Sequence, residues 1–344
     1  MPEAFLSIEV VKDRQSRPSE IVTARARVCV RTLAFHIQAD RLIFIGIAKG
    51  PLVSSKLTQT INSFFGARDE FSLKASRENF PVASRLLPRD VRSNLMAIYG
   101  FARLTDDIGD EAGGDRMALL DWLDDELNLA AAGQAIHPVF QRLTPLIRDL
   151  NVSLEPFRNL IEANRVDQVV TRYETFDDLV GYCMLSAAPV GRLVLAIFHV
   201  STPERTEWSD QVCIALQVVE HLQDVGEDAR RGRIYLPLDD LREFDCAEED
   251  LLLPTTSEAL RQVVAKETLR TRELLDAGDV LAASLPIRAR LAVAGFVGGG
   301  RAAADAIERE SYDVLGVSCR TSKRDVVART VRGFADASRH RSTA

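Results

Sequence analysis

Several common signatures are missing from this 344-residue chain. Its five cysteines are scattered and lack Cys-x-x-Cys spacing, which argues against a disulfide framework or a zinc site and favours reduced thiols. Positive charge is not in excess, because the formal net charge is −7, and this argues against nucleic acid as the main partner. No dinucleotide-binding glycine fingerprint is present either.

Long apolar runs are also scarce. A helix needs roughly 20 apolar residues to cross a bilayer, and the nearest run, residues 42–53, is short and contains Lys49. Charged residues among the first fourteen interrupt any signal-peptide pattern. We therefore expect a cytoplasmic protein without a membrane-spanning segment.

What is present is a helical pattern that continues nearly to the end of the chain. Residues 1–72 show only short apolar patches, so we treat them as an extension of unknown role in which disorder is an open alternative. Residues 73–338 show successive amphipathic stretches and no β-alternation of useful length. This pattern predicts a single all-α domain of about ten or more helices.

Proline and glycine mark the expected helix boundaries. A long helix should open at residues 88–90, where proline suits the first turn. Pro189 and Gly191 predict a kink or break within residues 175–200. The glycine run at 298–300 predicts another helix break, and without a preceding strand it does not predict a phosphate loop.

Two apolar helices each carry polar residues along a single stripe. Side chains three and four residues apart stack on the same helix face. Burying bare carboxylates is costly unless they meet cations or water, so both stripes should line a polar cavity. The stripe residues are Tyr99, Arg103, Asp106 and Asp110 in the first helix, and Gln217, Glu220, Asp224 and Asp228 in the second.

The paired aspartates suggest a metal–diphosphate site. Aspartates at i and i+4 lie about 6 Å apart along the helix axis, and Mg²⁺ takes one or two carboxylates together with phosphate oxygens. Metals held there would neutralise a diphosphate leaving group, while apolar walls would hold a hydrocarbon and keep water from a carbocation. The alternative is a pair of solvated helix faces, which is usual for a lone Asp-x-x-x-Asp.

The residues around these stripes resemble the squalene/phytoene synthase family. The similarity covers roughly residues 75–335 and is carried by residues 78–84, 99–111 and 223–237. It implies an isoprenoid synthase-type helical bundle with a central cavity. It also implies Mg²⁺-dependent chemistry on prenyl diphosphates.

The same resemblance assigns roles by position. It makes Asp106 and Asp110 the first metal-binding motif, and Asp224 and Asp228 the second. Arg233 follows the second motif, where a guanidinium suits contact with phosphate, although a solvated helix end is the alternative. The other matches to substrate or cavity positions are Tyr99, Arg103, Gln217, Tyr235, Phe80 and, where spacing varies more, Tyr312.

The second motif also indicates a branch of the family. Glu220 and Gln223 stand where phytoene and presqualene-diphosphate synthases usually carry Asn and Arg. Together with residues 78–81, they resemble the hydroxysqualene synthases of bacterial hopanoid pathways. The implied reaction joins presqualene diphosphate and water to give hydroxysqualene and diphosphate. Glu220 would position the water or, alternatively, hold a neighbouring Arg or Gln, and His221 is expected to be a buried structural histidine.

Two other functions stay open at this stage. One is condensation of two prenyl diphosphates to presqualene diphosphate, squalene or phytoene, which would be prenyl transfer within the same family. The other is a non-catalytic paralogue that acts in binding or assembly, and the intact aspartate pairs count against it. Substrates and products with long apolar chains also suggest loose contact with the inner membrane surface.

Overall fold

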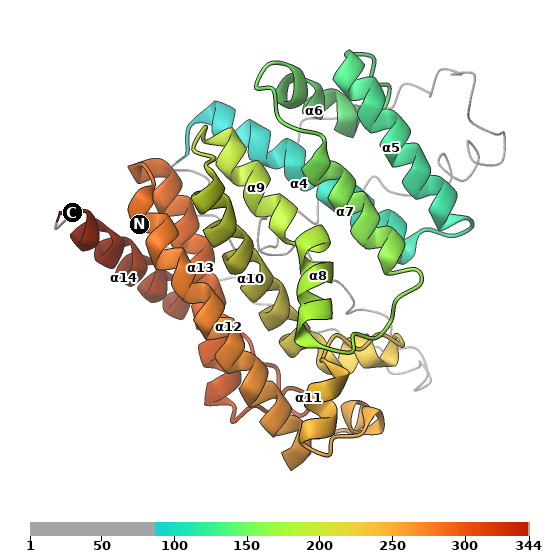
Figure 1. The fold of residues 1–344 in the computed structure, drawn as a ribbon, viewed down its shortest axis with the longest axis vertical. Coiled ribbons are helices and arrows are strands. Elements are labelled where there is room, and N and C mark those ends of the chain that lie inside the picture. Colours follow the sequence, from blue (N-terminus) through green and yellow to red (C-terminus); the bar gives the residue numbers. More distant parts are fainter. Residues whose placement is uncertain (1–86, 343–344) are drawn as a thin grey trace, which may run out of the picture.

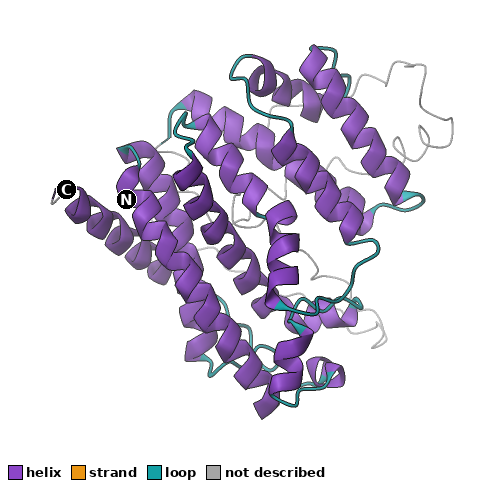
Figure 2. Ribbon diagram, in the orientation of Figure 1, coloured by secondary structure: helices purple, strands orange, loops and turns teal. Residues whose placement is uncertain are grey.

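The structure is a computed structural model, and it describes residues 87–342. These residues form α-helices joined mostly by short loops, with no strand among them beyond a single parallel bridge between Arg172 and Ile234 (Figures 1 and 2). The all-α prediction is confirmed. The helices are α4 (Arg89–Glu111), α5 (Arg116–Ala132), α6 (Pro138–Arg148), α7 (Glu155–Val166), α8 (Phe176–Ser186), α9 (Ala188–Ile197), α10 (Pro203–Arg230), α11 (Leu238–Glu243), α12 (Glu258–Ser284), α13 (Ile287–Arg309) and α14 (Lys323–Ser342), with the 3-10 helix η3 (Glu248–Leu252).

Helix α10 is the centre of the bundle. It packs against α8, α9, α12 and α13, and Figure 1 shows it between the α8–α9 pair and the α12–α13 pair. One apolar core joins α4 to α7 and α9, and two others join α10 to the helices on its other sides. The two aspartate stripes therefore lie on helices that are covered by neighbours on most faces.

Local sequence explains where the central helices begin. The Thr202 side chain accepts a hydrogen bond from the backbone N–H of Arg205, and Pro203 occupies the first turn of α10. Thr175 and Asp178 form a reciprocal capping box at the start of α8. Both helices therefore begin at capping residues that can be recognised in the sequence.

The predicted break at the glycine run is wrong. Helix α13 continues through residues 298–300 without interruption. A Cβ at Gly298 would lie 2.7 Å from the backbone nitrogen of Thr330 in α14, and one at Gly300 would lie 2.7 Å from Leu216 in α10. The glycines permit close approach of neighbouring helices, and tertiary packing overrides their weak helix propensity.

The break near Pro189 is present and falls at Ala187, between α8 and α9. The combined stretch Phe176–Ile197 meets the length and composition of a membrane span, so the expectation that no segment would do so is wrong for this one. Half of its most apolar window is buried inside the bundle. Its apolar character is therefore also what packing against α7 and α10 requires.

Candidate active site

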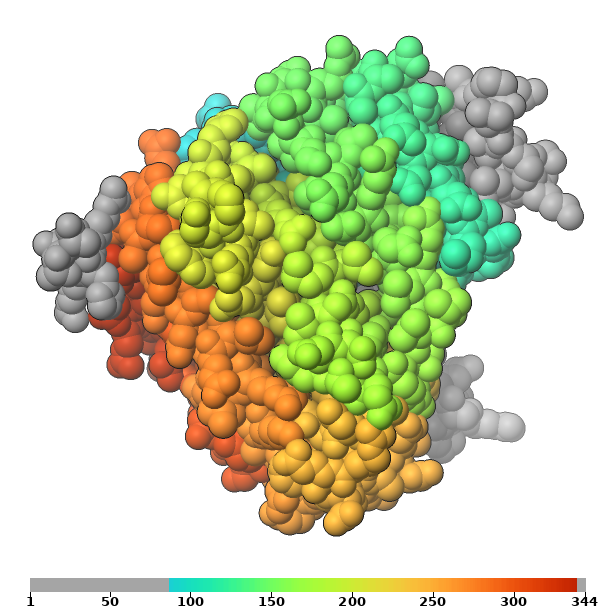
Figure 3. Space-filling view, viewed as in Figure 1, coloured from blue at the N-terminus to red at the C-terminus, as the bar shows by residue number. Residues whose placement is uncertain are grey.

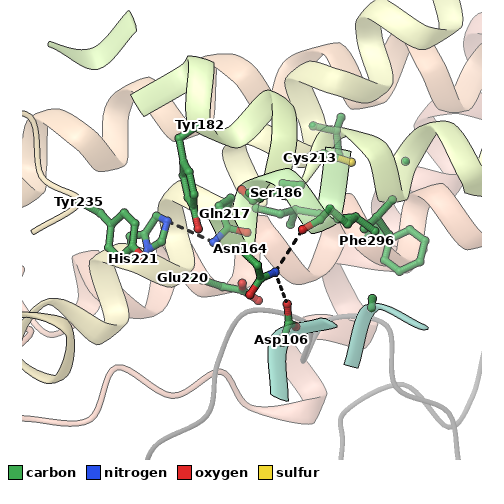
Figure 4. A pocket seen from close by; sticks show the side chains of 18 of the residues that line it. Asp106, Asn164, Tyr182, Ser186, Cys213, Gln217, Glu220, His221, Tyr235 and Phe296 are labelled. Carbon is green, nitrogen blue, oxygen red and sulfur yellow. Dashed lines mark hydrogen bonds between the residues drawn. The ribbon is translucent and has the colours of Figure 1, made fainter. Parts of the chain in front are cut away.

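A cavity lies between α4, α7, α8, α9, α10, α12 and α13. It holds about 1330 Å³ of space free of protein atoms, part of it open to solvent. Side chains of α7, α8 and α9 pack over the face of the bundle shown in Figure 3. The lining of the cavity divides into a polar end near Asp106, Arg233 and Tyr235 and an apolar end near Val293 and Phe296. Figure 4 shows Tyr235 and His221 opposite Phe296.

The first aspartate motif places two carboxylates on the cavity wall. Asp106 and Asp110 both line it, one helical turn apart on α4. The Asn164 amide donates a 3.4 Å hydrogen bond to Asp106, and Gly109 makes room for this contact because a Cβ there would lie 1.9 Å from Asn164 Oδ1. Burial, and then the charge of Asp110, raises the pKa of Asp106 well above its ordinary value. The charge of Arg103 lowers the pKa of Asp106 only in part, so burial and Asp110 dominate.

Arg233 brings positive charge to the same end. It follows α10 in a short extended segment and forms an ion pair with Asp110 at 2.9 Å. Arg231, two residues earlier, also lines the cavity. The predicted phosphate-binding arginine is therefore beside the predicted metal-binding carboxylates.

The second stripe reaches the cavity from α10. Gln217, Glu220 and Asp228 line it, whereas Asp224 is half-buried on the same stripe and outside the lining. His221 lines it as well, and its Nε2 contacts the Gln217 amide nitrogen at 3.1 Å. The histidine predicted to be structural thus bonds a cavity side chain.

Sequence reasoning missed an acidic residue at the polar end. Asp167 caps the C-terminus of α7 and accepts hydrogen bonds from the hydroxyls of Tyr182, at 2.7 Å, and Tyr235, at 3.2 Å. Burial raises the pKa of Asp167, while the charge of Arg233 lowers it. All four residues line the cavity. The signal for Asp167 was weak, because a lone aspartate at a helix end is ordinary.

The remaining predicted residues lie elsewhere or outside the described range. Tyr99 is buried on α4 and Arg103 pairs with Asp107 at 2.7 Å, and neither belongs to the cavity lining formed by residues 87–342. Tyr312 adopts φ 61° and packs against the core cluster around α10 to α12 rather than at the cavity. Phe80 lies outside the described residues.

The donor set suits Mg²⁺ that arrives with a diphosphate. Within residues 87–342, no three His, Cys, Asp or Glu side chains converge closely enough to hold a metal ion by themselves. Mg²⁺ usually binds through one or two carboxylates, keeping water and substrate phosphate as its other ligands. Asp106 and Asp110 on one wall and Asp228 on another fit that arrangement. Burial and the charge of Asp110 raise the pKa of Asp106, and a cation bound beside it would favour its charged form.

Comparison with known proteins identifies the family. The sequence model of squalene/phytoene synthase matches residues 73–327. The chain belongs to the squalene/phytoene synthase family. Members of this family are prenyltransferase-type enzymes of isoprenoid biosynthesis that act on prenyl diphosphates.

Individual relatives agree with this membership. A hydroxysqualene synthase of Zymomonas mobilis is 37% identical over 212 residues, covering 60% of this chain and 71% of its own. A phytoene synthase of Arthrospira platensis is 34% identical over 253 residues, covering 69% and 82%. The crystal structure of squalene synthase HpnC from Alicyclobacillus acidocaldarius superposes with a TM-score of 0.65 at 39% identity, covering 76% and 97%. The isoprenoid synthase fold is thereby established for the squalene/phytoene synthase-like part of the chain.

Proposed function

We propose that this enzyme converts presqualene diphosphate and water to hydroxysqualene and diphosphate, with Mg²⁺ as cofactor. The observation that carries the proposal is Glu220, a carboxylate in the cavity wall one turn from the second aspartate motif. The similarity to a hydroxysqualene synthase supports the same reaction. This family member is a carbon–oxygen lyase under this proposal.

The polar end would release the diphosphate. Asp106, Asp110, Asp224 and Asp228 would hold Mg²⁺, which would supply Lewis-acid stabilisation of the leaving oxygen. Arg233 would donate hydrogen bonds to the phosphate oxygens, since a guanidinium fork matches their geometry. The carbon–oxygen bond breaks with its electron pair leaving on the diphosphate, so positive charge remains on the hydrocarbon.

The apolar end would hold the hydrocarbon. Leu195, Val212, Leu216, Val293 and Phe296 line that part of the cavity and bring no charge. Such walls bind prenyl chains through the hydrophobic effect and keep bulk water from the cation. Water is then admitted only where polar side chains can hold it.

Glu220 would supply that position. A carboxylate accepts hydrogen bonds from water, which orients the oxygen lone pair toward the cation. The water oxygen forms the new carbon–oxygen bond, and the proton it loses passes to the Glu220 carboxylate. A purely structural role, in which Glu220 holds a neighbouring side chain, is the alternative.

A second candidate is prenyl transfer, in which two prenyl diphosphates condense to presqualene diphosphate, squalene or phytoene. The longer match to a phytoene synthase favours it. Both reactions need the same aspartates and the same apolar cavity. They differ in the substrate that the purified enzyme consumes.

A product assay separates the two. Purified enzyme with Mg²⁺ and without NADPH receives farnesyl diphosphate alone or presqualene diphosphate alone, and extracts are analysed by mass spectrometry. The proposal expects hydroxysqualene from presqualene diphosphate only. Presqualene diphosphate formed from farnesyl diphosphate would show prenyl transfer instead, and no turnover of either would point to a non-catalytic paralogue.

We also propose a cytoplasmic location with loose contact at the inner membrane surface. Both substrate and product are long hydrocarbons that partition into lipid. Flotation of the enzyme with anionic vesicles tests this contact, and recovery only in the vesicle-free fraction would contradict it.

A further inference from the structure

Both ring nitrogens of His221 lie close to polar side chains, and one face of the ring is stacked. Its Nε2 faces the Gln217 amide nitrogen at 3.1 Å, and its Nδ1 lies 3.7 Å from a carboxylate oxygen of Asp228. One ring face stacks on Tyr235 with centroids 3.8 Å apart and an interplanar angle of 13°. The residue is 8% exposed and lines the cavity. The His221 ring is therefore held by polar contacts as well as by packing.

The contact with Gln217 fixes the tautomer. An amide nitrogen only donates, so Gln217 Nε2 donates and His221 Nε2 must accept. A neutral imidazole that accepts at Nε2 carries its proton on Nδ1. That nitrogen lies 3.7 Å from an Asp228 carboxylate oxygen, which is too long for a hydrogen bond but close enough for an electrostatic contact. The His221–Gln217 contact therefore ties the orientation of the amide to that of the ring.

The contact with His221 sets the orientation of the Gln217 side chain. Its side chain is 3% exposed and lines the cavity one turn before Glu220 on α10. With Nε2 committed to His221, the direction of the planar amide is set. The carbonyl oxygen is then the part of the amide that can accept a hydrogen bond at this wall. Figure 4 shows Gln217, His221 and Glu220 on the same side of the cavity.

We propose that His221 is a positioning residue that fixes the Gln217 amide, and that this orientation helps to hold the water that quenches the cation. The inference rests on the proposed hydroxysqualene reaction and adds a residue to it. Two fates compete for the cation. Water adds its oxygen to carbon and loses a proton to Glu220, giving the alcohol. Otherwise a neighbouring carbon loses a proton to the released diphosphate and a double bond forms, giving an unsaturated hydrocarbon.

A matched pair of variants separates the hydrogen bond from the ring. His221→Phe keeps an aromatic ring against Tyr235 and removes the acceptor for Gln217. His221→Gln removes the ring and keeps an acceptor oxygen within reach of Gln217. Gln217→Leu removes the other partner of the same hydrogen bond. Circular dichroism melting first confirms which variants fold.

The readout is the ratio of alcohol to hydrocarbon formed from presqualene diphosphate, with diphosphate release measured separately. Loss of one hydrogen bond should change the alcohol-to-hydrocarbon ratio about fivefold. His221→Phe and Gln217→Leu should therefore each lower this ratio about fivefold. His221→Gln should keep the ratio within about twofold of the parent enzyme. The double variant His221→Phe/Gln217→Leu should lower it no further than either single change, because one interaction is removed only once.

Equal ratios in His221→Phe and His221→Gln, or an unchanged ratio in Gln217→Leu, would overturn the proposal. A parent enzyme that forms no alcohol would overturn the proposed reaction and the quenching role together. The His221–Gln217 contact is tested separately by ¹⁵N NMR of the imidazole, with His221→Phe assigning the resonance. A protonated Nδ1 and an Nε2 signal that moves in Gln217→Leu are expected, and a protonated Nε2 would contradict the assignment.

Discussion

Arg233 and Asp110 form an ion pair at 2.9 Å although 123 residues separate them in the chain. The contact joins the segment after α10 to the first aspartate motif on α4. Arg233 is also close enough to Asp167 for its charge to lower the pKa of that carboxyl. One guanidinium thus lies between two acids at the polar end of the cavity, where a diphosphate would compete for it.

Arg233→Ala should weaken binding of inorganic diphosphate in the presence of Mg²⁺. A charge-assisted hydrogen bond contributes enough that Kd should rise about tenfold or more. Arg233→Lys should recover part of the loss, because it keeps the charge without the fork. Isothermal titration calorimetry measures both values.

The control for this change is Arg242→Ala, which removes another arginine–carboxylate pair. Arg242 and Glu174 are 60% and 59% exposed, so their pair is a surface contact outside the lining. Its Kd for diphosphate should match that of the parent enzyme. Equal losses in the two variants would show that Arg233 has no particular role in diphosphate binding.

Asp106→Asn and Asp224→Asn should each lower turnover about a hundredfold or more, since each removes a group that positions charge at the leaving oxygen. The parent enzyme should gain thermal stability when Mg²⁺ and diphosphate are added together, because ligands that bind the folded state stabilise it. Both variants should lose that gain. Asp276→Asn, at a side chain 77% exposed, is the control, and a gain in Asp106→Asn equal to that of the parent would contradict the metal assignment.

Glu220→Asn should reduce alcohol formation more than it reduces binding of presqualene diphosphate. The substitution removes the carboxylate that would hold water and take its proton, while the groups around the diphosphate remain. Steady-state kinetics should show a lower kcat with KM little changed. Glu207→Asn, at an exposed position on the same helix, should behave as the parent; unchanged product and rate in Glu220→Asn would end this assignment.

Gly298→Ala should destabilise the bundle by about 1–3 kcal/mol, the usual range for forcing atoms into a packed interface. The new Cβ would lie 2.7 Å from the backbone nitrogen of Thr330, which cannot rotate away. Gly181→Ala, at an exposed position in α8 with no atom within 4 Å, should instead stabilise by up to about 1 kcal/mol. Urea unfolding compares the two, and a neutral Gly298→Ala would show that α13 and α14 are less tightly packed.

Acid should weaken the fold through His137. Burial lowers the pKa of this residue from its ordinary 6.5 to about 4, so the folded protein holds it neutral. The unfolded chain takes up a proton below pH 6.5, and stability from this residue is complete above that pH. It is lost as the pH falls toward 4, by up to about 3 kcal/mol.

His137→Asn tests this dependence. Asparagine can still accept a hydrogen bond at the start of α6, as His137 does from the Val139 N–H. The variant should be less stable at every pH, because the ring contacts with Trp122 and Phe140 are lost. Its stability should nevertheless fall less between pH 6.5 and 4. An unchanged slope would assign the acid sensitivity to other groups, such as Asp313, whose carboxyl pKa is lowered in the fold by hydrogen bonds and by Arg261.

Much of the fold was predictable because local signals and packing agree. The start of α4 after Pro88 and the break between α8 and α9 follow from proline chemistry that no neighbour overrides. The continuous α13 was not predictable, because its glycines are accommodated by contacts with Thr330 and Leu216. Such contacts join residues far apart in the chain, and a single sequence does not show them.

Some residues of the site were predictable from the sequence and others were not. The stripes on α4 and α10 predicted that Asp106 and Glu220 would face one cavity, since helix periodicity fixes which residues share a face. Asp167 and Asn164 reach the same cavity from α7 and its end, but neither belongs to a recognisable spacing. Their place depends on how α7 crosses α4, which is a tertiary relationship.

Capture of water by the cation is the central claim, and isotope labelling tests it most directly. The enzyme is incubated with Mg²⁺ and presqualene diphosphate in water enriched in ¹⁸O, and the product is analysed by mass spectrometry. We predict hydroxysqualene whose single oxygen carries the label, because that oxygen comes from solvent. An unlabelled alcohol would mean that a diphosphate oxygen returns to carbon, and a hydrocarbon alone would mean that the cation loses a proton; either result would contradict the account.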